Sequence, residues 1–148
     1  MATIDLREGG TLALPVNTGF GALTVMENTI DFAAHPQTAD QLVQLFHVPA
    51  GTIVLAVGYR VETLEGGTLT FDIGDADNAD DYIDGANGNN SSAYYGWSLL
   101  TLTEGTPNTV TGYTAGKLYE SAGVIGLTPK NDADKAKIKV KVFAVSLA

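Results

Sequence analysis

The residues best suited to chemistry lie in an acidic segment, GDADNADDYIDG, at positions 74–85. It begins with the D-x-D pattern of a calcium-binding loop at Asp75 and Asp77, whose carboxylates are the hard oxygen ligands that Ca²⁺ prefers. An EF-hand also needs an oxygen ligand, a glycine and a glutamate at its fifth, sixth and twelfth positions, where this chain has Ala79, Asp80 and Ala86. The residue types therefore favour a solvated turn. An irregular calcium site stays open, with ligands from Asp75, Asp77, Asp80 or Asp84.

Other catalytic constellations are missing from the sequence. A glycosidase needs two carboxyl groups held at a fixed separation across a cleft, but here the acids crowd one polar loop, where nothing separates their pKa values. His35 precedes Pro36 in an expected turn and His47 ends an apolar strand, and no G-x-S-x-G nucleophile motif accompanies them. No glycine-rich phosphate loop is present. We therefore expect no enzymatic activity and no cofactor.

An aromatic cluster, AYYGW at 93–97, allows two interpretations. On an exposed strand end, Tyr94, Tyr95 and Trp97 would stack against sugars or anchor a protein interface. In a core strand, Tyr95 and Trp97 would share a buried face with Leu99. The core interpretation fits the apolar neighbours better, and the exposed one defines a competing function.

Composition and charge narrow the class of protein. The chain has 148 residues, 17 glycines, no cysteine and a formal net charge of −9. The length fits one domain, the glycines favour a sheet protein with many turns, and the lack of cysteine excludes disulfides. The negative charge argues against nucleic acid as a partner, because such binding relies on clustered Lys and Arg. No run of about 18 apolar residues and no secretory signal are present, so we expect no membrane insertion and no export by that route.

Two neighbouring segments carry the clearest strand pattern. Residues 52–64, TIVLAVGYRVETL, alternate with one apolar face made of Ile53, Leu55, Val57, Tyr59 and Val61. Residues 68–74, TLTFDIG, alternate likewise, with Leu69, Phe71 and Ile73 expected inward and Asp72 outward. Residues 65–67, EGG, have the types of a tight turn, so we expect the two strands to form a hairpin.

Further strand signals stand at 29–32, 40–48, 93–102, 108–114, 116–121, 124–129 and 135–147, while 74–92 has the composition of a long polar loop. In the last strand, lysines from Lys135 to Lys141 alternate with aliphatic residues, which predicts one solvated face and one buried face. The repeated charge would also protect a sheet edge from aggregation. About eight strands with no helix fit a two-sheet antiparallel β-sandwich of jelly-roll type, with a closed barrel as the alternative.

The first part of the chain has no sustained period and is interrupted by glycine and proline. We therefore divide the chain into an extended N-terminal arm, residues 1–28, and a β-sandwich domain, residues 29–148. A terminal arm is mobile until it docks on something. Its apolar residues predict docking on its own domain or on a partner, with the interface formed by Leu12, Leu14, Val16 and Phe20.

The order of several short motifs resembles a group of small structural proteins from tailed bacteriophages. TIDF at 29–32 leads to an apolar strand ending in VPAG, then to TFDIGD and DYIDGAN, and later to YTAGKLY and LTPKN before the closing strand. The resemblance covers residues 29–146. It implies a rim turn at the end of the acidic loop, where Tyr82 and Ile83 would tuck back onto the core.

The resemblance also implies a function. Members of this group are non-enzymatic virion components with a β-sandwich fold, and the implied role is capsid decoration. The protein would bind the outer surface of the phage head as a homotrimer and clamp neighbouring subunits of the major capsid protein. A place in a fibre or tail is the alternative, as an adhesin module that binds host-surface carbohydrate through the aromatic cluster.

Overall fold

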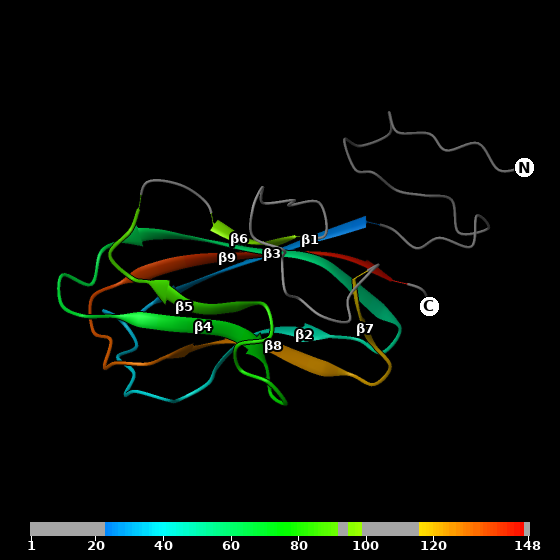
Figure 1. Cartoon of the computed structure of the whole chain (residues 1–148), viewed down its shortest axis with the longest axis horizontal. Coiled ribbons are helices and arrows are strands. Elements are labelled where there is room, and N and C mark those ends of the chain that lie inside the picture. Colours follow the sequence, from blue (N-terminus) through cyan, green and yellow to red (C-terminus); the bar gives the residue numbers. More distant parts are fainter. Residues whose placement is uncertain (1–22, 92–94, 99–115, 147–148) are drawn as a thin grey trace, which may run out of the picture.

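The computed structural model describes residues 23–91, 95–98 and 116–146, which form two antiparallel β-sheets packed face to face (Figure 1). In this part of the chain no helix is long and apolar enough to cross a membrane. The strands are β1 (Leu23–Asp31), β2 (Val43–Val48), β3 (Thr52–Thr63), β4 (Thr70–Asp75), β5 (Ile83–Asn87), β6 (Tyr95–Ser98), β7 (Lys117–Tyr119), β8 (Gly123–Pro129) and β9 (Lys137–Ser146).

The strand order is that of a jelly roll. One sheet has the order β1-β9-β3-β6, and β7 also pairs with β3; the other sheet has the order β2-β8-β4-β5. Strands β1 to β4 therefore alternate between the sheets, and each pairs with a strand from the second half of the chain: β1 with β9, β2 with β8, β3 with β6 and β4 with β5. The predicted two-sheet sandwich is confirmed, and the closed-barrel alternative is wrong.

The lysine-rich last strand follows its predicted alternation. Ile138, Val140 and Val142 are fully buried between the sheets, while the lysines face away from the core. However, β9 lies between β1 and β3 in the interior of its sheet (red between blue and green in Figure 1), so its charges protect no edge. The edge strand beside it is β1, which begins at Leu23 and therefore takes residues 23–28 from the predicted arm.

A β-bulge changes the buried face of β3. The register against β9 shifts between Val54 and Ala56, so Leu55 is the extra residue. Val54 is buried before the bulge, and Val57, Tyr59 and Val61 are buried after it. The prediction of one apolar face from Ile53 to Val61 is correct for the second half of the strand and wrong for the first, where Ile53 and Leu55 are half-buried.

The predicted hairpin between the third and fourth strands does not form. β3 and β4 belong to different sheets, so residues 64–69 cross from one sheet to the other. Glu65 is 4% exposed, and its carboxylate accepts hydrogen bonds from the backbone N–H groups of Asp134, Lys135 and Ala136, at 2.7 to 3.1 Å. This side chain clips the β3–β4 crossing to the β8–β9 connection at one end of the sandwich.

The residues predicted to face inward are confirmed, since Leu69, directly before β4, and Phe71 and Ile73 within it are all buried. Asp72, expected to face solvent, is also buried, because its carboxylate accepts the Gly85 N–H at 2.8 Å and pairs with Lys130 at 3.1 Å. Across the sandwich, the rings of Tyr59 and Phe71 meet edge to face at 5.0 Å between centroids.

The segment predicted as one polar loop, residues 74–92, contains strand β5. Tyr82 is buried in the core, and Ile83, the first residue of β5, packs against it. The predicted return of these two residues to the core is confirmed. The acidic stretch is thus a short connection between paired strands, with its start and end both fixed to the second sheet.

Candidate interface on the outer face of the first sheet

The acidic loop is built around Asp75, the last residue of β4. Its Oδ1 accepts the backbone N–H groups of Asp77 at 3.0 Å and Asn78 at 2.9 Å, the hydrogen bonds of an Asx turn. Gly74 permits this close turn, because a Cβ there would lie 2.2 Å from the carbonyl oxygen of Asn78. The turn leaves the second carboxylate oxygen of Asp75 directed toward β7.

Strand β7 supplies the partners of that oxygen. Lys117 Nζ forms ion pairs with Asp75 and with Asp81, and the Tyr119 hydroxyl donates a hydrogen bond to Asp75 Oδ2 at 3.1 Å. The hydroxyls of Tyr119 and Tyr82 are hydrogen-bonded to each other at 2.9 Å. These five residues, Asp75, Asp81, Tyr82, Lys117 and Tyr119, are called the Lys117 cluster below.

Burial and charge shift the pKa values in the Lys117 cluster. Burial alone would raise the pKa of Asp75, but the hydrogen bonds from Lys117 and Asn78 outweigh it and hold that pKa below the usual value. Burial alone would lower the pKa of Lys117, but its bonds to Asp75 and Asp81 raise it above the usual value. Burial raises the pKa of Tyr82 and Tyr119. Asp75 and Lys117 are therefore charged, and the two tyrosines neutral, at neutral pH.

The cluster is arranged for structure rather than for catalysis or metal binding. Asp75 and Asp81 are already paired with a lysine, whereas Asp77, Asp80 and Asp84 are exposed. Among the described residues, no three His, Asp or Glu side chains gather where they could hold a metal ion. The ion pairs and hydrogen bonds of the Lys117 cluster connect β7 to the β4–β5 loop at one end of the sandwich.

Fixing β7 completes a row of apolar side chains on the outer face of the first sheet. Leu23, Val145, Ile53 and Leu118 are paired in turn across β1, β9, β3 and β7. Next to this row, Val25 is paired with Phe143. We call these six residues the apolar half. Four of them are exposed, from 36% for Phe143 to 52% for Val25: Leu23, Val25, Leu118 and Phe143.

The other end of the same face is charged. Lys139 Nζ lies 3.1 Å from Glu62 and 3.6 Å from Glu27, and Lys141 Nζ lies 3.4 Å from Glu27. Lys137 lies 3.8 Å from Asp31. These pairs balance the lysines with acids of the flanking strands. One face of one sheet is thus divided into a charge-paired half and an apolar half, and a contiguous exposed apolar patch of this kind is typical of a protein interface.

The sequence contained a signal for the apolar half that the strand pattern alone did not bring out. In β9 the outward positions run Lys137, Lys139, Lys141, and then change to Phe143 and Val145. Leu23 and Val25 were assigned to the arm. The partner-interface residues predicted from the sequence, Leu12, Leu14, Val16 and Phe20, lie outside the described residues, as do Tyr94 and the side chains of Tyr95 and Trp97.

The histidines are not part of either feature. His35 lies in the turn after β1, where its N–H donates to the Asp31 carbonyl at 3.0 Å, as predicted. His47 lies near the end of β2, as predicted, and its side chain is exposed.

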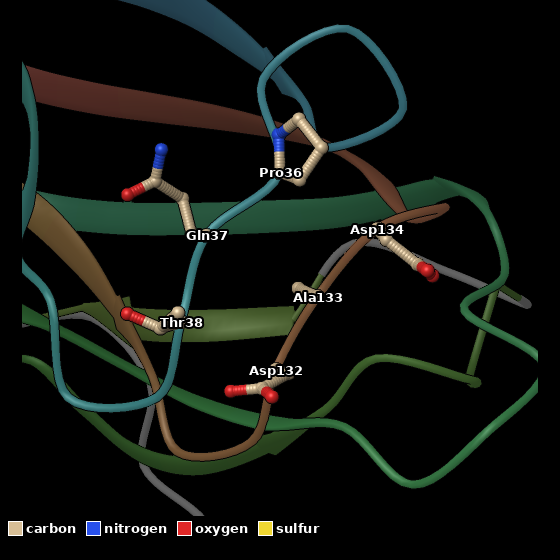
Figure 2. A pocket seen from close by; sticks show the side chains of 6 residues that line it. All are labelled: Pro36, Gln37, Thr38, Asp132, Ala133 and Asp134. Atoms are coloured by element: carbon tan, nitrogen blue, oxygen red, sulfur yellow. The ribbon is translucent and has the colours of Figure 1, made fainter.

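A concave region lies at the end of the sandwich opposite β7 (Figure 1). Figure 2 shows its lining, in which residues 36–38 run beside residues 132–134. The two segments are joined by backbone hydrogen bonds in both directions between Gln37 and Ala133, each 3.0 Å long. Asp132 accepts the Ala39 N–H at 2.9 Å. These backbone bonds and the Asp132 carboxylate hold the two segments together, and we assign the region no ligand.

Comparison with known proteins places the fold among phage capsid structures. A chain of the cyanophage Pam1 capsid asymmetric unit matches with a TM-score of 0.59 and 21% identity, over 99% of this chain and 99% of that one. A chain of the Ralstonia phage GP4 capsid matches with a TM-score of 0.50 and 19% identity, over 93% of this chain and 92% of that one. No protein-family model and no curated protein matches. With identities of 21% and 19%, these two matches show that the chain shares the fold of the two capsid chains.

Proposed function

We propose that this protein is a non-enzymatic virion component that decorates the outside of a tailed-phage capsid. In this proposal it binds subunits of the major capsid protein as a homotrimer and stabilises the shell. The observation that carries it is the match over 99% of both chains to a chain of the Pam1 capsid structure. The motif order described above supports the same role.

The physical features of the surface support a binding role. Burying the apolar half against a partner removes apolar surface from water. This burial stabilises the complex by about 25 cal/mol per Å² of apolar surface. Its neighbouring half is charge-paired, which limits nonspecific adhesion of the whole face. A cysteine-free sandwich gains further stability from assembly, because binding to the folded state alone shifts the folding equilibrium.

The test is binding to heads that lack the protein. We expect the purified wild-type chain to occupy the outside of such heads in hundreds of copies and to raise the temperature at which they release DNA. A chain lacking residues 1–20 should bind less, because the predicted interface residues are lost. A copy number of a few dozen would contradict decoration and favour the fibre or adhesin role.

Surface variants test the contribution of the apolar half. Val25→Asp places a charge in the apolar half and should weaken head binding at least about tenfold, equivalent to 1.4 kcal/mol. Leu64→Asp is the matched control, because Leu64 is 46% exposed, comparable with Val25, but lies outside this face. Equal loss of binding in both variants would show that the apolar half has no special part in the contact.

A further inference from the structure

The Lys117 cluster holds an amine from one sheet against a carboxyl group from the other. Lys117 belongs to β7, which pairs with β3 in the first sheet, and Asp75 is the last residue of β4 in the second sheet. Lys117 Nζ contacts Oδ2 of Asp75 and also Oδ2 of Asp81. An amine and a carboxyl group are the two halves of an amide bond, and holding two reactants in place is equivalent to a concentration of about 10⁵–10⁸ M.

The two carboxylate oxygens of Asp75 have different donors. Oδ1 accepts the backbone N–H groups of Asp77 at 3.0 Å and Asn78 at 2.9 Å. During an attack on Cγ, these two donors would stabilise the negative charge that develops on Oδ1, as in an oxyanion hole. Oδ2 accepts the Tyr119 hydroxyl at 3.1 Å, so this oxygen has a proton donor beside it. Asp75 is therefore arranged with one oxygen to be held and one to leave.

Asp81 supplies the base that an ammonium group needs before its nitrogen can attack. Its Oδ2 contacts Lys117 Nζ, so it is placed to accept a proton from the ammonium and pass it to the departing oxygen of Asp75. The side chains of Lys117, Asp75 and Asp81 are 18%, 6% and 9% exposed, which limits the access of water that would hydrolyse the product. The rings of Tyr82 and Tyr119, centred 5.7 and 5.4 Å from Nζ, enclose the amine further.

We infer that Lys117 and Asp75 condense into an intramolecular isopeptide bond, with Asp81 as the proton relay. In this step the Cγ–Nζ bond forms and the Cγ–Oδ2 bond breaks. The ammonium loses two of its three protons, both leave on Oδ2 as one water molecule, and Asp81 ends in the charge state in which it began. The step needs no oxidant, reductant or further reactant. Its product joins β4 of one sheet covalently to β7 of the other.

The charged state of the pair makes this reaction slow. The nitrogen attacks only as a neutral amine, and Cγ is a good electrophile only when the carboxyl group carries a proton. The reactive form is therefore the minor one in which a proton has moved from Lys117 to the acids beside it. Chains that have not yet reacted keep the ion pairs described above. The product accumulates with time, because the buried amide is shielded from water.

The test is the mass of the whole chain, measured under denaturing conditions before and after prolonged warm incubation in the folded state. We expect a species lighter by one water molecule to accumulate. Trypsin then locates the bond, because an acylated lysine is not cleaved: residues 61–130 should appear as one peptide, uncut after Lys117, and its fragments should connect Lys117 to Asp75. A chain that keeps its full mass and is cut after Lys117 would overturn the inference, and this result depends on no variant.

Variants that keep their fold by circular dichroism test the assigned roles. Lys117→Arg keeps a cation beside the acids but has no amine for this bond, so its mass should stay constant. A loss of water that persists in Lys117→Arg comes from another site, such as a cyclic imide at Asp84 and Gly85, and overturns the inference. Asp81→Asn should slow the reaction about a hundredfold or more. Asp77→Asn, which changes an exposed acid of the same loop, should react like the wild type, and equal rates in these two variants contradict the proton relay.

Discussion

Replacing Lys117 by methionine should destabilise the protein substantially, although the residue lies in a three-residue strand near the surface. The Lys117 side chain is 18% exposed, and those of its partners Asp75 and Asp81 are 6% and 9% exposed. Lys117→Met leaves two buried carboxylates facing each other without a cation. Removing one partner of a buried pair costs about 3–5 kcal/mol, and we expect the lower end because Asp75 keeps its backbone donors.

The assay is thermal and urea unfolding of the wild-type and variant chains. A loss of about 3 kcal/mol corresponds to a fall in Tm of roughly 6–12 °C for a domain of this length. Lys137→Met is the matched control, because Lys137 lies 3.8 Å from Asp31 and both side chains are about two-fifths exposed, at 43% and 39%. Exposed pairs of this kind contribute less than about 1 kcal/mol.

A double-mutant cycle isolates the interaction itself. Combining Lys117→Met with Asp75→Asn should cost less than the sum of the single changes, with a coupling of about 1–3 kcal/mol. Hydrogen exchange of the Leu118 amide should accelerate in Lys117→Met, because β7 loses its anchor to the β4–β5 loop. If Lys117→Met is no less stable than Lys137→Met, the reasoning that the cluster holds β7 in place is refuted.

The remaining predictions concern the two depressed carboxyl pKa values and the tight loop. Burial would raise the pKa of Glu65, but three backbone N–H donors lower it. Glu65→Gln should therefore reduce the free energy of unfolding by about 2 kcal/mol, measured by urea unfolding. An unchanged urea midpoint would contradict the role of Glu65 in holding the β3–β4 crossing to the β8–β9 connection. The pKa values of Glu65 and Asp75 are lower in the folded chain than in the unfolded chain. The two carboxylates therefore stabilise the fold above about pH 4.3 and 3.9, and this stabilisation is lost as the pH falls through their folded-state pKa values. An acid titration followed by circular dichroism should show unfolding there, at a higher pH in Lys117→Met than in wild type. Gly74→Ala should destabilise the protein because its Cβ would clash with the Asn78 carbonyl, while Gly67→Ala, which has open space, should cost far less; equal Tm values would refute the close approach.

Much of the fold follows from local periodicity. A period of two residues puts Ile138, Val140 and Val142 on one face and the lysines on the other, whatever the partners of the strand. The turn at Gly51, with φ of 82°, is likewise set by a residue that tolerates this conformation. Most of the described strands and the sandwich class could be inferred from such patterns, since each pattern involves only residues close together in the sequence.

The candidate site was much less predictable. Asp75 and Lys117 are 42 residues apart, and nothing in the acidic segment indicates that its partner is a lysine from another strand. The apolar half combines side chains of four strands, none of which has a long apolar run on its outward face. An outward Phe143 is a weak signal alone and becomes a patch only where Val25 lies beside it.

The sequence by itself determined most of the described strands, though not β5 or the start of β1, and also the faces of most of them, the lack of disulfides and the negative charge. The tertiary structure decided which strands pair, and the physical reason is that a period of two specifies a buried face without specifying a neighbour. Thus the expected hairpin became a crossing between sheets, with Glu65 turned inward to backbone donors 69 residues or more away. The acidic segment, a candidate metal site by residue type, became the anchor of β7 because a lysine reached it from across the sandwich.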